Sequence, residues 1–425
     1  MKISKYLLFL TVSFLPLYVL RANDFPTTFL EILIFVTLGS WFVERTFEGE
    51  FNFRLLKTPF DLLILLLFVV SVVETALSPD LRGGVGILKA YFLDPILLFY
   101  LSVWWGRKEG VRFLLWALLS CSVIVSTLSV IQVTTGYFVF APQELLLGRA
   151  TSFFNSANSV GLLIGPILAL SFPFILQFKR SLFGLFVVFA AFISFIAIFL
   201  AESRGTYISL ILVLTFYLGF FISRKLVVSK KSIIALPVLM TLFPVVLVGV
   251  VYLSMLKFNL TSPVRDFVYT GADTMQIRLY LWKGTFQLIS DHPLFGAGLN
   301  GFKDTYSGSY VLPQYTEALQ YPHNLWLTIY VELGFFGFLI FLAIFFVAAR
   351  SVFADLEKSK KDFGNEKLFY KSAALPLGLL GALLYIQIHG LVDVPYFKND
   401  LACQFWIVIG LVALLRTMES KKLSL

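Results

Sequence analysis

Residues 323–337, HNLWLTIYVELGFFG, decide the fold, because they begin an apolar segment directly after the longest hydrophilic interruption of the chain, residues 257–322. His323 therefore stands where a membrane span would meet water. The interruption before it carries five basic side chains, among them Arg265, Arg278 and Lys283. A titratable group beside several cations at the edge of a span is the strongest site candidate in the chain, although a histidine there could also be a polar residue at headgroup level.

The whole chain has the composition of a membrane protein. Of its 425 residues, 58% are apolar and 14% are charged, and the mean hydropathy is +0.86. Soluble domains carry about 25% charged residues, and the repeated apolar runs approach the roughly 20 residues needed to cross a bilayer. We therefore predict an all-α polytopic protein, with residues 1–425 forming a single integral membrane domain.

Hydropathy predicts about twelve membrane spans. The first is interpreted as an uncleaved span, because no small-residue cleavage site follows its basic start. With the N-terminus inside, the inner segments hold 23 of the 34 Lys and Arg residues. By the positive-inside rule, we expect both termini in the cytoplasm and the 257–322 loop in the periplasm, with the chain in a bacterial inner membrane. The predicted spans are 5–21, 27–43, 59–77, 85–105, 111–135, 158–178, 182–201, 205–222, 233–256, 323–349, 372–392 and 400–416.

Several function classes are disfavoured by the distribution of residues. The net charge is +9, but the basic residues lie in short connectors and not in the stripe typical of nucleic-acid binding. Cys121 and Cys403 lie alone in apolar segments, so neither a disulfide framework nor a zinc site is indicated. The outer segments contain no Asp-x-Asp pair and no Walker-type loop. We expect no metal and no cofactor.

Two features of the 257–322 loop have a structural interpretation. Apolar residues recur at helical spacing over 277–289, which predicts an amphipathic helix packed on the membrane or on the spans. The run GAGLNG at 296–301 matches a nucleotide-binding pattern, but no strand precedes it. We interpret it as a tight turn.

The glycines after His323 suggest which way the histidine faces. Gly334 follows it by eleven residues, which is about three turns of an uninterrupted helix. Gly334 and Gly337 would then share the face of His323, and small residues allow close helix packing in a bilayer. We predict that both glycines pack against a neighbouring helix and turn His323 into the bundle.

Other ionisable residues stand at the same predicted outer side. Arg204 lies in the short turn between two spans, where its guanidinium could bind phosphate or anchor the span to headgroups. Lys89 lies near the outer end of its span and could face a cavity or extend to the interface. His389 and Asp393 are four residues apart, so they could pair on one helix face or line the outer cavity. Asn324, beside His323, is a further candidate.

Four motifs resemble those of the O-antigen ligase and polymerase family of membrane glycosyltransferases, the Wzy-C type. His323-Asn324 followed by Gly334 and Gly337 fits the histidine motif of the ligases, and SRGTYI at 203–208 is similar to the arginine motif, with isoleucine in place of leucine. HPLFGAG at 292–298 and RATSFFNSAN at 149–158 also resemble family signatures. The resemblance covers roughly 85–410, with 150–350 as its approximate core.

The resemblance implies a bundle of the GT-C-like kind with a periplasmic site. It implies functional roles for Lys89, Arg204, Arg278 and His323, and a glycan linked to undecaprenyl diphosphate as donor. We expect His323 to act as general base, since histidine ordinarily titrates near about 6.5. Arg204 and Arg278, with Lys89 and Arg265, would bind the diphosphate.

The acceptor stays open at this point. The complete histidine motif favours a ligase that joins O-antigen to lipid A-core in lipopolysaccharide biosynthesis. A polysaccharide polymerase or a protein O-glycan ligase would share the same chemistry. A transporter of lipid-linked sugars is the alternative from another class, although its site would be expected near mid-membrane with repeat symmetry.

Overall fold

The computed structural model describes residues 2–21, 27–49, 53–175, 181–227, 274–311, 319–359 and 366–415. Within these ranges the chain is helical, and its β-structure is limited to an isolated bridge between Arg21 and Thr28. The predicted span at 233–256 and the candidate Arg265 lie outside the described residues. The elements are α1 (Ile3–Ser13), the 3-10 helices η1 (Leu15–Val19) and η2 (Phe53–Leu55), α2 (Phe29–Glu48), α3 (Asp61–Ala76), α4 (Leu81–Ile87), the π-helical turn η3 (Leu88–Leu93), α5 (Asp94–Glu109), α6 (Val111–Thr135), α7 (Pro142–Leu146), α8 (Asn158–Ile175), α9 (Leu182–Ala201), α10 (Arg204–Val227), α13 (Thr274–Asp291), α14 (Phe302–Ser309), α15 (Leu325–Lys358), α16 (Glu366–His389) and α17 (Asn399–Leu415).

The helices form a polytopic membrane bundle. Large apolar side chains remain exposed in stripes on its outside, for example Phe192, Phe195 and Phe199 on α9. Exposed apolar stripes of this kind are expected where lipid replaces water as the solvent. By length and composition, seven helices of the described chain could cross a membrane: Leu81–Glu109, Val111–Thr135, Asn158–Ile175, Leu182–Ala201, Arg204–Phe221, Leu325–Lys358 and Ser372–His389.

The predicted number of twelve spans is not confirmed, and the first predicted span is wrong as a continuous helix. Where 5–21 was expected to cross, α1 ends at Ser13 and η1 follows with Pro16 near its start. Proline lacks the amide hydrogen that would continue the helix. Hydropathy detects the apolar run but not this break. At the other end, α17 is apolar but shorter than the seven spans.

The centre of the bundle is built from α8, α16, α17 and α5. Helix α16 packs along α8, and α17 packs along α5. Helices α6 and α9 pack against one another and flank α8. The described part of α17 is buried throughout, so it lies inside the bundle and not at the lipid face.

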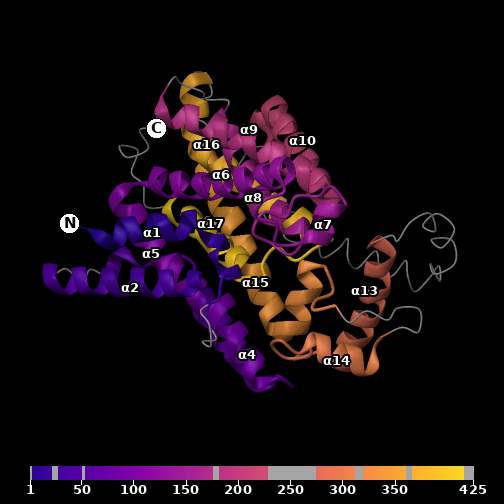
Figure 1. The fold of residues 1–425 in the computed structure, drawn as a ribbon. Coiled ribbons are helices and arrows are strands. Elements are labelled where there is room, and N and C mark those ends of the chain that lie inside the picture. The colour runs from indigo at the N-terminus through magenta and orange to yellow at the C-terminus, as the bar shows by residue number, and fades with distance from the viewer. Residues whose placement is uncertain are drawn as a thin grey trace.

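A small lobe stands at the end of the bundle where α15 begins (Figure 1). Helix α13 confirms the predicted amphipathic helix, and its apolar face packs on α14 and α15. Leu281, Trp282 and Leu288 of α13 meet Phe302 of α14 and Val331 of α15 in a separate apolar cluster. The lobe is therefore fixed to the first part of α15, directly beside His323.

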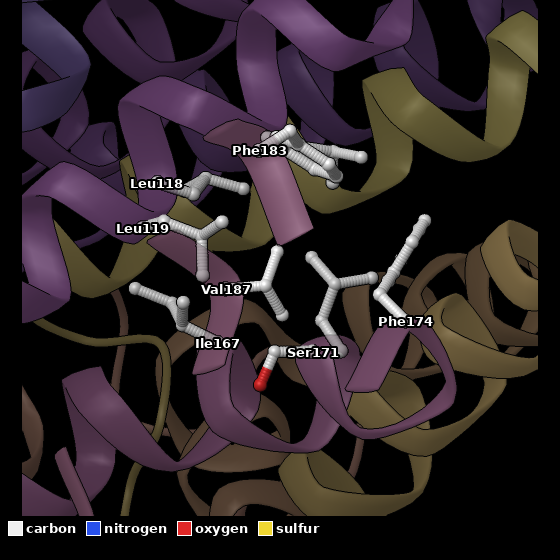
Figure 2. Close-up of a pocket in the computed structure, with 9 residues that line it drawn as sticks. Leu118, Leu119, Ile167, Ser171, Phe174, Phe183 and Val187 are labelled. Carbon is white, nitrogen blue, oxygen red and sulfur yellow. The ribbon is translucent and has the colours of Figure 1, made fainter. Parts of the chain in front are cut away.

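A small apolar pocket lies between α6, α8 and α9 (Figure 2). Its one hydroxyl, that of Ser171, donates a hydrogen bond to the Leu168 carbonyl of its own helix. Ser171 is thirteen residues along α8 from Asn158, which corresponds to roughly 20 Å of helix. The pocket is therefore well separated from the polar groups at the start of α8.

Candidate active site

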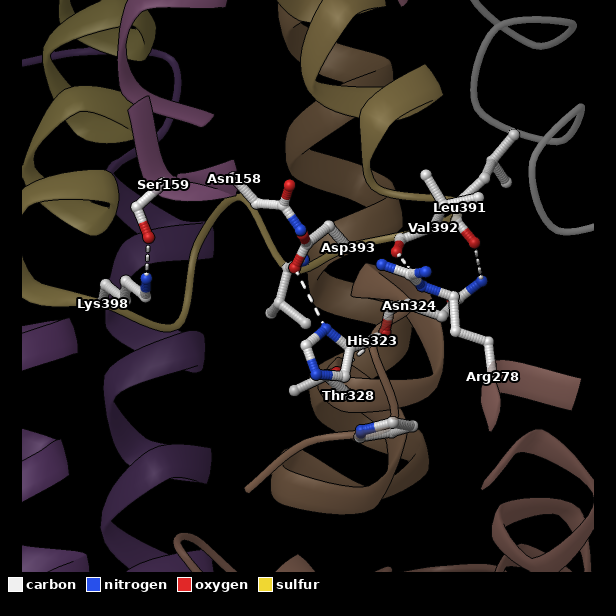
Figure 3. Close-up of polar contacts among 12 residues, drawn as sticks. Asn158, Ser159, Arg278, His323, Asn324, Thr328, Leu391, Val392, Asp393 and Lys398 are labelled. Atoms are coloured by element: carbon white, nitrogen blue, oxygen red, sulfur yellow. Dashed lines mark hydrogen bonds and ion pairs between the residues drawn. The ribbon is translucent and has the colours of Figure 1, made fainter. Parts of the chain in front are cut away.

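The centre of the candidate site is a hydrogen bond between His323 and Asp393. Nδ1 of His323 lies 3.2 Å from an Asp393 carboxylate oxygen, while 34% of the histidine side chain remains exposed (Figure 3). Asp393 belongs to the connector 390–398, which joins α16 to α17. The pair thus presents a histidine to solvent while one of its nitrogens is held by a carboxylate.

Local backbone structure fixes the position of His323. Its φ is +50°, a left-handed conformation that residues other than glycine seldom adopt. The next residue, Asn324, is the N-cap of α15, and its side-chain oxygen accepts from the amides of Trp326 and Leu327. The histidine is therefore not on the helix; it is held just before its first turn.

The same turn is joined to the connector by two further hydrogen bonds. The Asn324 amide group donates to the Leu391 carbonyl at 2.9 Å, and the Leu325 amide donates to the Gly390 carbonyl at 2.7 Å. These contacts hold Asp393 opposite His323. Asn324 therefore acts on the geometry of the pair rather than pointing into open space.

The environment of Asp393 favours its ionised form. Burial alone would raise the pKa of this carboxyl group, but the hydrogen bond with His323 and the nearby positive charges, including Arg278, lower it below its usual range. The Val394 amide also donates to the same carboxylate oxygen. Asp393 is thus an anion at neutral pH, placed to accept the Nδ1 hydrogen of a neutral imidazole.

Arg278 reaches the connector from α13. Its Nε donates to the Val392 carbonyl at 2.7 Å, next to Asp393 (Figure 3). Four residues later on the same helix, Trp282 donates its indole hydrogen to the Pro322 carbonyl at 2.9 Å. Helix α13 therefore contacts the two backbone segments that carry the His323–Asp393 pair, at Pro322 and at Val392.

Arg204 is exposed at the first residue of α10, as expected for a tight turn. Among the residues that the structure describes, it has neither a hydrogen-bond nor an ion-pair partner. The next residue, Gly205, lies against the connector: a Cβ added there would approach His389 Nε2 to 2.9 Å and a Val392 methyl to 3.3 Å. Arg204 and Arg278 therefore belong to elements that contact the same residue, Val392.

Among the described helices, four begin around the connector. They are α8 at Asn158, α10 at Arg204, α15 at Leu325 and α17 at Asn399. Lys398, just before α17, donates to the Ser159 hydroxyl of α8 at 2.5 Å (Figure 3). Each helix start carries a partial positive charge of about half a unit, so this end of the bundle attracts anions even before its arginines are counted.

Lys89 is placed differently from the arginines. Its ammonium forms an ion pair with Glu31 at 2.8 Å, and Glu31 also accepts from the Asn399 side-chain amide. The Lys89 side chain is 30% exposed and that of Glu31 is 4% exposed. The positive charge of Lys89 is therefore largely offset by an internal carboxylate.

Part of the chain matches the model of a known protein family. Residues 189–342 match the Wzy_C family model, which is described as O-antigen ligase. The resemblance to the O-antigen ligase family is confirmed. The match contains Arg204, Arg278 and His323, begins after Lys89 and ends before Asp393. The comparison with curated proteins found no match.

The match to this family model supports a general function for the chain. The match supports an enzyme of the O-antigen ligase or polymerase type, acting on a lipid-linked glycan and an acceptor. Together with the spanning helices, it indicates a multi-pass bacterial membrane protein.

Two glycines of the ligase motif have a role beyond the predicted helix packing. Gly334 interrupts α15 with φ +63° and ψ −173°, so His323, Gly334 and Gly337 do not share one continuous helix face. The break lets the Phe335 amide donate to the Leu294 carbonyl, with which a Cβ on Gly334 would collide. A Cβ on Gly337 would collide with Leu333 of its own helix across the kink. The predicted shared helix face is therefore wrong, and these glycines allow the kink and the docking of the lobe. The predicted packing against a neighbouring helix holds for Gly334, because a Cβ there would also approach the Glu74 carboxylate of α3 to 2.9 Å.

The run 296–301 is a tight turn, as predicted. Gly296, Gly298 and Asn300 all have positive φ. Buried Glu332 accepts from the Asn300 and Phe302 amides, and the Ala297 amide donates to the Val331 carbonyl. These hydrogen bonds show that the turn fixes the lobe to α15.

His389 does not pair with Asp393, although the two are four residues apart. Helix α16 ends at His389, and the imidazole is buried with its Nδ1 3.0 Å from the Tyr385 hydroxyl. Tyr385 in turn donates to the Gly161 carbonyl of α8. His389 thus contributes to the packing of α16 on α8, and the Asp393 side chain forms its hydrogen bond with His323.

Sequence reasoning missed three polar residues that border the site. Asn158 is the first residue of α8, and its side-chain oxygen accepts from Arg149 at 3.1 Å, while the next residue, Ser159, accepts from Lys398 of the connector. Arg149 and Lys398 are the other two residues. Arg149 and Asn158 stand at the ends of the RATSFFNSAN motif, so the signal was present, but their pairing depends on how the 136–157 loop folds.

Proposed function

We propose that this protein transfers a glycan from undecaprenyl diphosphate to an acceptor hydroxyl at the periplasmic face of the bacterial inner membrane. The favoured reaction is ligation of O-antigen to lipid A-core in lipopolysaccharide biosynthesis. In this orientation both termini are cytoplasmic and the 257–322 loop is periplasmic. The observation that carries the proposal is the exposed His323, held through Nδ1 by ionised Asp393 within a positively charged helix end.

His323 is the general base of the proposed reaction. When its Nδ1–H donates to Asp393, the lone pair of Nε2 is left to accept a proton. The acceptor hydroxyl gives its proton to Nε2 as its oxygen attacks the anomeric carbon of the donor sugar. The imidazolium formed in this step is then stabilised by the Asp393 carboxylate, as in other carboxylate–histidine pairs.

The leaving group requires a positive environment. As the new glycosidic bond forms, the bond from the anomeric carbon to the phosphate oxygen breaks, and its electron pair remains on undecaprenyl diphosphate. Arg204 and Arg278 stabilise this charge, Arg204 with a guanidinium that has no partner among the described residues. A single displacement inverts the anomeric configuration, and it requires neither a metal nor a nucleotide because the donor bond is already activated.

Lys89 and Arg265 complete the set of residues that we propose to bind the diphosphate. Lys89 contributes less than the arginines because Glu31 already neutralises most of its charge. Its side chain is 30% exposed, and its positive charge would add to the attraction of the diphosphate.

The test of the proposed function is transfer by the purified protein in detergent. The protein is incubated with an undecaprenyl-diphosphate glycan and, in parallel, with lipid A-core, with glycan repeats and with a protein acceptor. We expect glycosylated lipid A-core with inverted anomeric configuration. Chain extension or protein glycosylation would instead assign the polymerase or protein ligase reaction. No product with any acceptor, together with movement of the donor lipid across vesicles, would replace the enzyme by a transporter.

A further inference from the structure

The loop between α6 and α8 exposes large apolar side chains that no described element covers. Tyr137 is 70% exposed, Phe138 66%, Leu146 88% and Leu147 71%. They come from two parts of the loop, the turn after α6 and the end of α7. Exposing a cluster of this kind to water would be unfavourable by roughly 25 cal/mol per Å² of apolar surface.

The loop is built rigidly, so this exposure does not come from a loose loop tip. The side chain of Gln132 donates to the Phe138 and Ser152 carbonyls and accepts from the Ser152 amide. Arg149 forms an ion pair with Glu144 at 2.8 Å, just behind the exposed leucines. Polar groups thus hold the loop together on the inside, and apolar groups are presented on the outside.

The exposed loop surface continues the lipid-facing surface of α9. On that helix Leu185, Phe189, Phe192 and Phe199 recur at helical spacing, and each is at least half exposed. The stripe ends beside the loop, where the Ala150 amide donates to the Leu200 carbonyl at 2.8 Å. Because the exposed side chains of the loop continue this stripe, we infer that lipid covers both surfaces.

We propose that residues 137–147 insert into the membrane leaflet at the His323 end of the bundle. The chemistry of the patch favours lipid over a glycan, because its two most exposed residues are leucines, which cannot stack on sugar rings. The tyrosine, with an apolar ring and a polar hydroxyl, suits the interfacial layer of a bilayer. Lipid acyl chains would then cover the apolar side chains that a soluble protein would bury in its own core.

The inserted loop also positions the site. Arg149 donates to the Asn158 side chain at 3.1 Å and to the Ala201 carbonyl at 3.2 Å. Asn158 begins α8, whose next residue Ser159 accepts from Lys398 of the connector that carries Asp393, and Ala201 ends the helix before the turn of Arg204. The loop therefore connects the leaflet surface to the starts of α8 and α10 at the candidate site, a consequence that rests on the proposed function.

Insertion is tested by a fluorescent label, without any assay of activity. The native thiols Cys121 and Cys403 are fully buried, so single cysteines introduced by Leu147→Cys and Tyr137→Cys can be labelled selectively with NBD. Ser307→Cys, beside exposed Lys303 and Asp304 on α14, is the matched control. The labelled proteins are reconstituted into vesicles of phosphatidylethanolamine and phosphatidylglycerol that contain nitroxide lipids.

We expect blue-shifted emission at positions 137 and 147, with quenching by the nitroxide lipids at least about threefold stronger than at position 307. Equal quenching at all three positions would overturn the insertion. A blue shift without lipid quenching would also overturn it, since the loop would then be covered by protein.

A second comparison tests the link to the site and distinguishes the two proposals. In the Leu146→Asp/Leu147→Asp variant, a label at Tyr137→Cys should lose its quenching by nitroxide lipids, and glycan transfer should fall several-fold. The Leu146→Ala/Leu147→Ala variant should keep both the quenching and the transfer. Unchanged quenching in the aspartate variant would contradict insertion through these leucines. Failure of transfer in the wild-type protein would remove the proposed function but leave the quenching result valid.

Discussion

The His323–Asp393 region and the Glu31–Lys89 region both pair a basic side chain with a carboxylate. The basic members are similarly accessible, at 34% and 30% exposure. The difference lies in what remains after pairing. An imidazole bound through Nδ1 keeps a lone pair on Nε2, whereas an ammonium has no lone pair to offer. The first pair can move a proton, and the second can only hold charge.

The surroundings of the two pairs differ in the same sense. Glu31 lies at the start of α2, where Thr28 and Asn399 also bond it, so its pair is enclosed by internal contacts. His323 lies where α8, α10, α15 and α17 begin, near an arginine with no partner among the described residues. The Glu31–Lys89 pair is surrounded by internal contacts, whereas the His323–Asp393 pair lies where the proposed donor would bind.

The largest effect is expected for His323→Ala. Removal of the base should lower transfer by about 10³-fold or more, while the protein still inserts and elutes as the wild type. His323 is at the surface before α15, so its loss opens no core cavity. Transfer within a few-fold of wild type would remove the base assignment.

Asp393→Asn should be the next most severe change. The amide can still fill the space, but it no longer stabilises an imidazolium, and we expect transfer to fall about 100-fold. His389→Gln, at the last residue of α16, is the matched control, because the His389 side chain contacts the Tyr385 hydroxyl. An Asp393→Asn enzyme as active as this control would show that the carboxylate does not assist His323.

Arg204→Lys should lower transfer about tenfold, because the charge is kept while the two-pronged guanidinium is lost. Measurement of KM for the lipid donor and of kcat in the variant would locate the loss. Full activity would instead identify Arg204 as a headgroup anchor.

The Glu31–Lys89 pair should respond mainly in stability. Lys89→Met leaves a buried carboxylate unpaired and should lower Tm, whereas the double variant Glu31→Gln/Lys89→Met should recover most of the loss. We expect the double variant to remain a few-fold less active than wild type, because Lys89 assists the diphosphate. Wild-type transfer by the double variant would assign Lys89 to structure alone.

The smallest effect concerns pH. The pKa of Asp393 is lowered in the folded protein, so its contribution to stability is present above the unfolded pKa of about 3.9 and declines as the pH falls below it. The Tm difference between wild type and Asp393→Asn should narrow as the pH falls from about 5 toward 3. A difference that stays constant to pH 3 would contradict the lowered pKa.

The membrane class and the gathering of His323, Arg278 and Arg204 at one end could be predicted from the sequence. Arg204 and His323 lie at the edges of apolar runs whose order puts them on one side, and Arg278 lies in the loop on that same side. The family motifs added the chemistry. Lys89 could be placed near the same end, but its pairing with Glu31 depends on how α2 packs beside η3 and α17.

The partner of His323 could not be predicted because it depends on where helices stop. The spacing of His389 and Asp393 favours a pair only if α16 continues, whereas it ends at His389 and the connector turns Asp393 toward α15. Gly334 shows the same limit. Counting turns assumed an unbroken helix, and the positive φ of this glycine breaks it so that the 294–302 turn can dock.

The most direct test of the account separates donor binding from transfer in the same samples. Binding of a fluorescent undecaprenyl-diphosphate glycan and single-turnover transfer are measured for wild type, His323→Ala and Arg204→Ala/Arg278→Ala. The account predicts that His323→Ala binds the donor as wild type does but transfers nothing measurable, while the double arginine variant binds weakly. A His323→Ala protein that binds poorly, yet transfers the glycan it does bind at the wild-type rate, would contradict the assignment of His323 as the base.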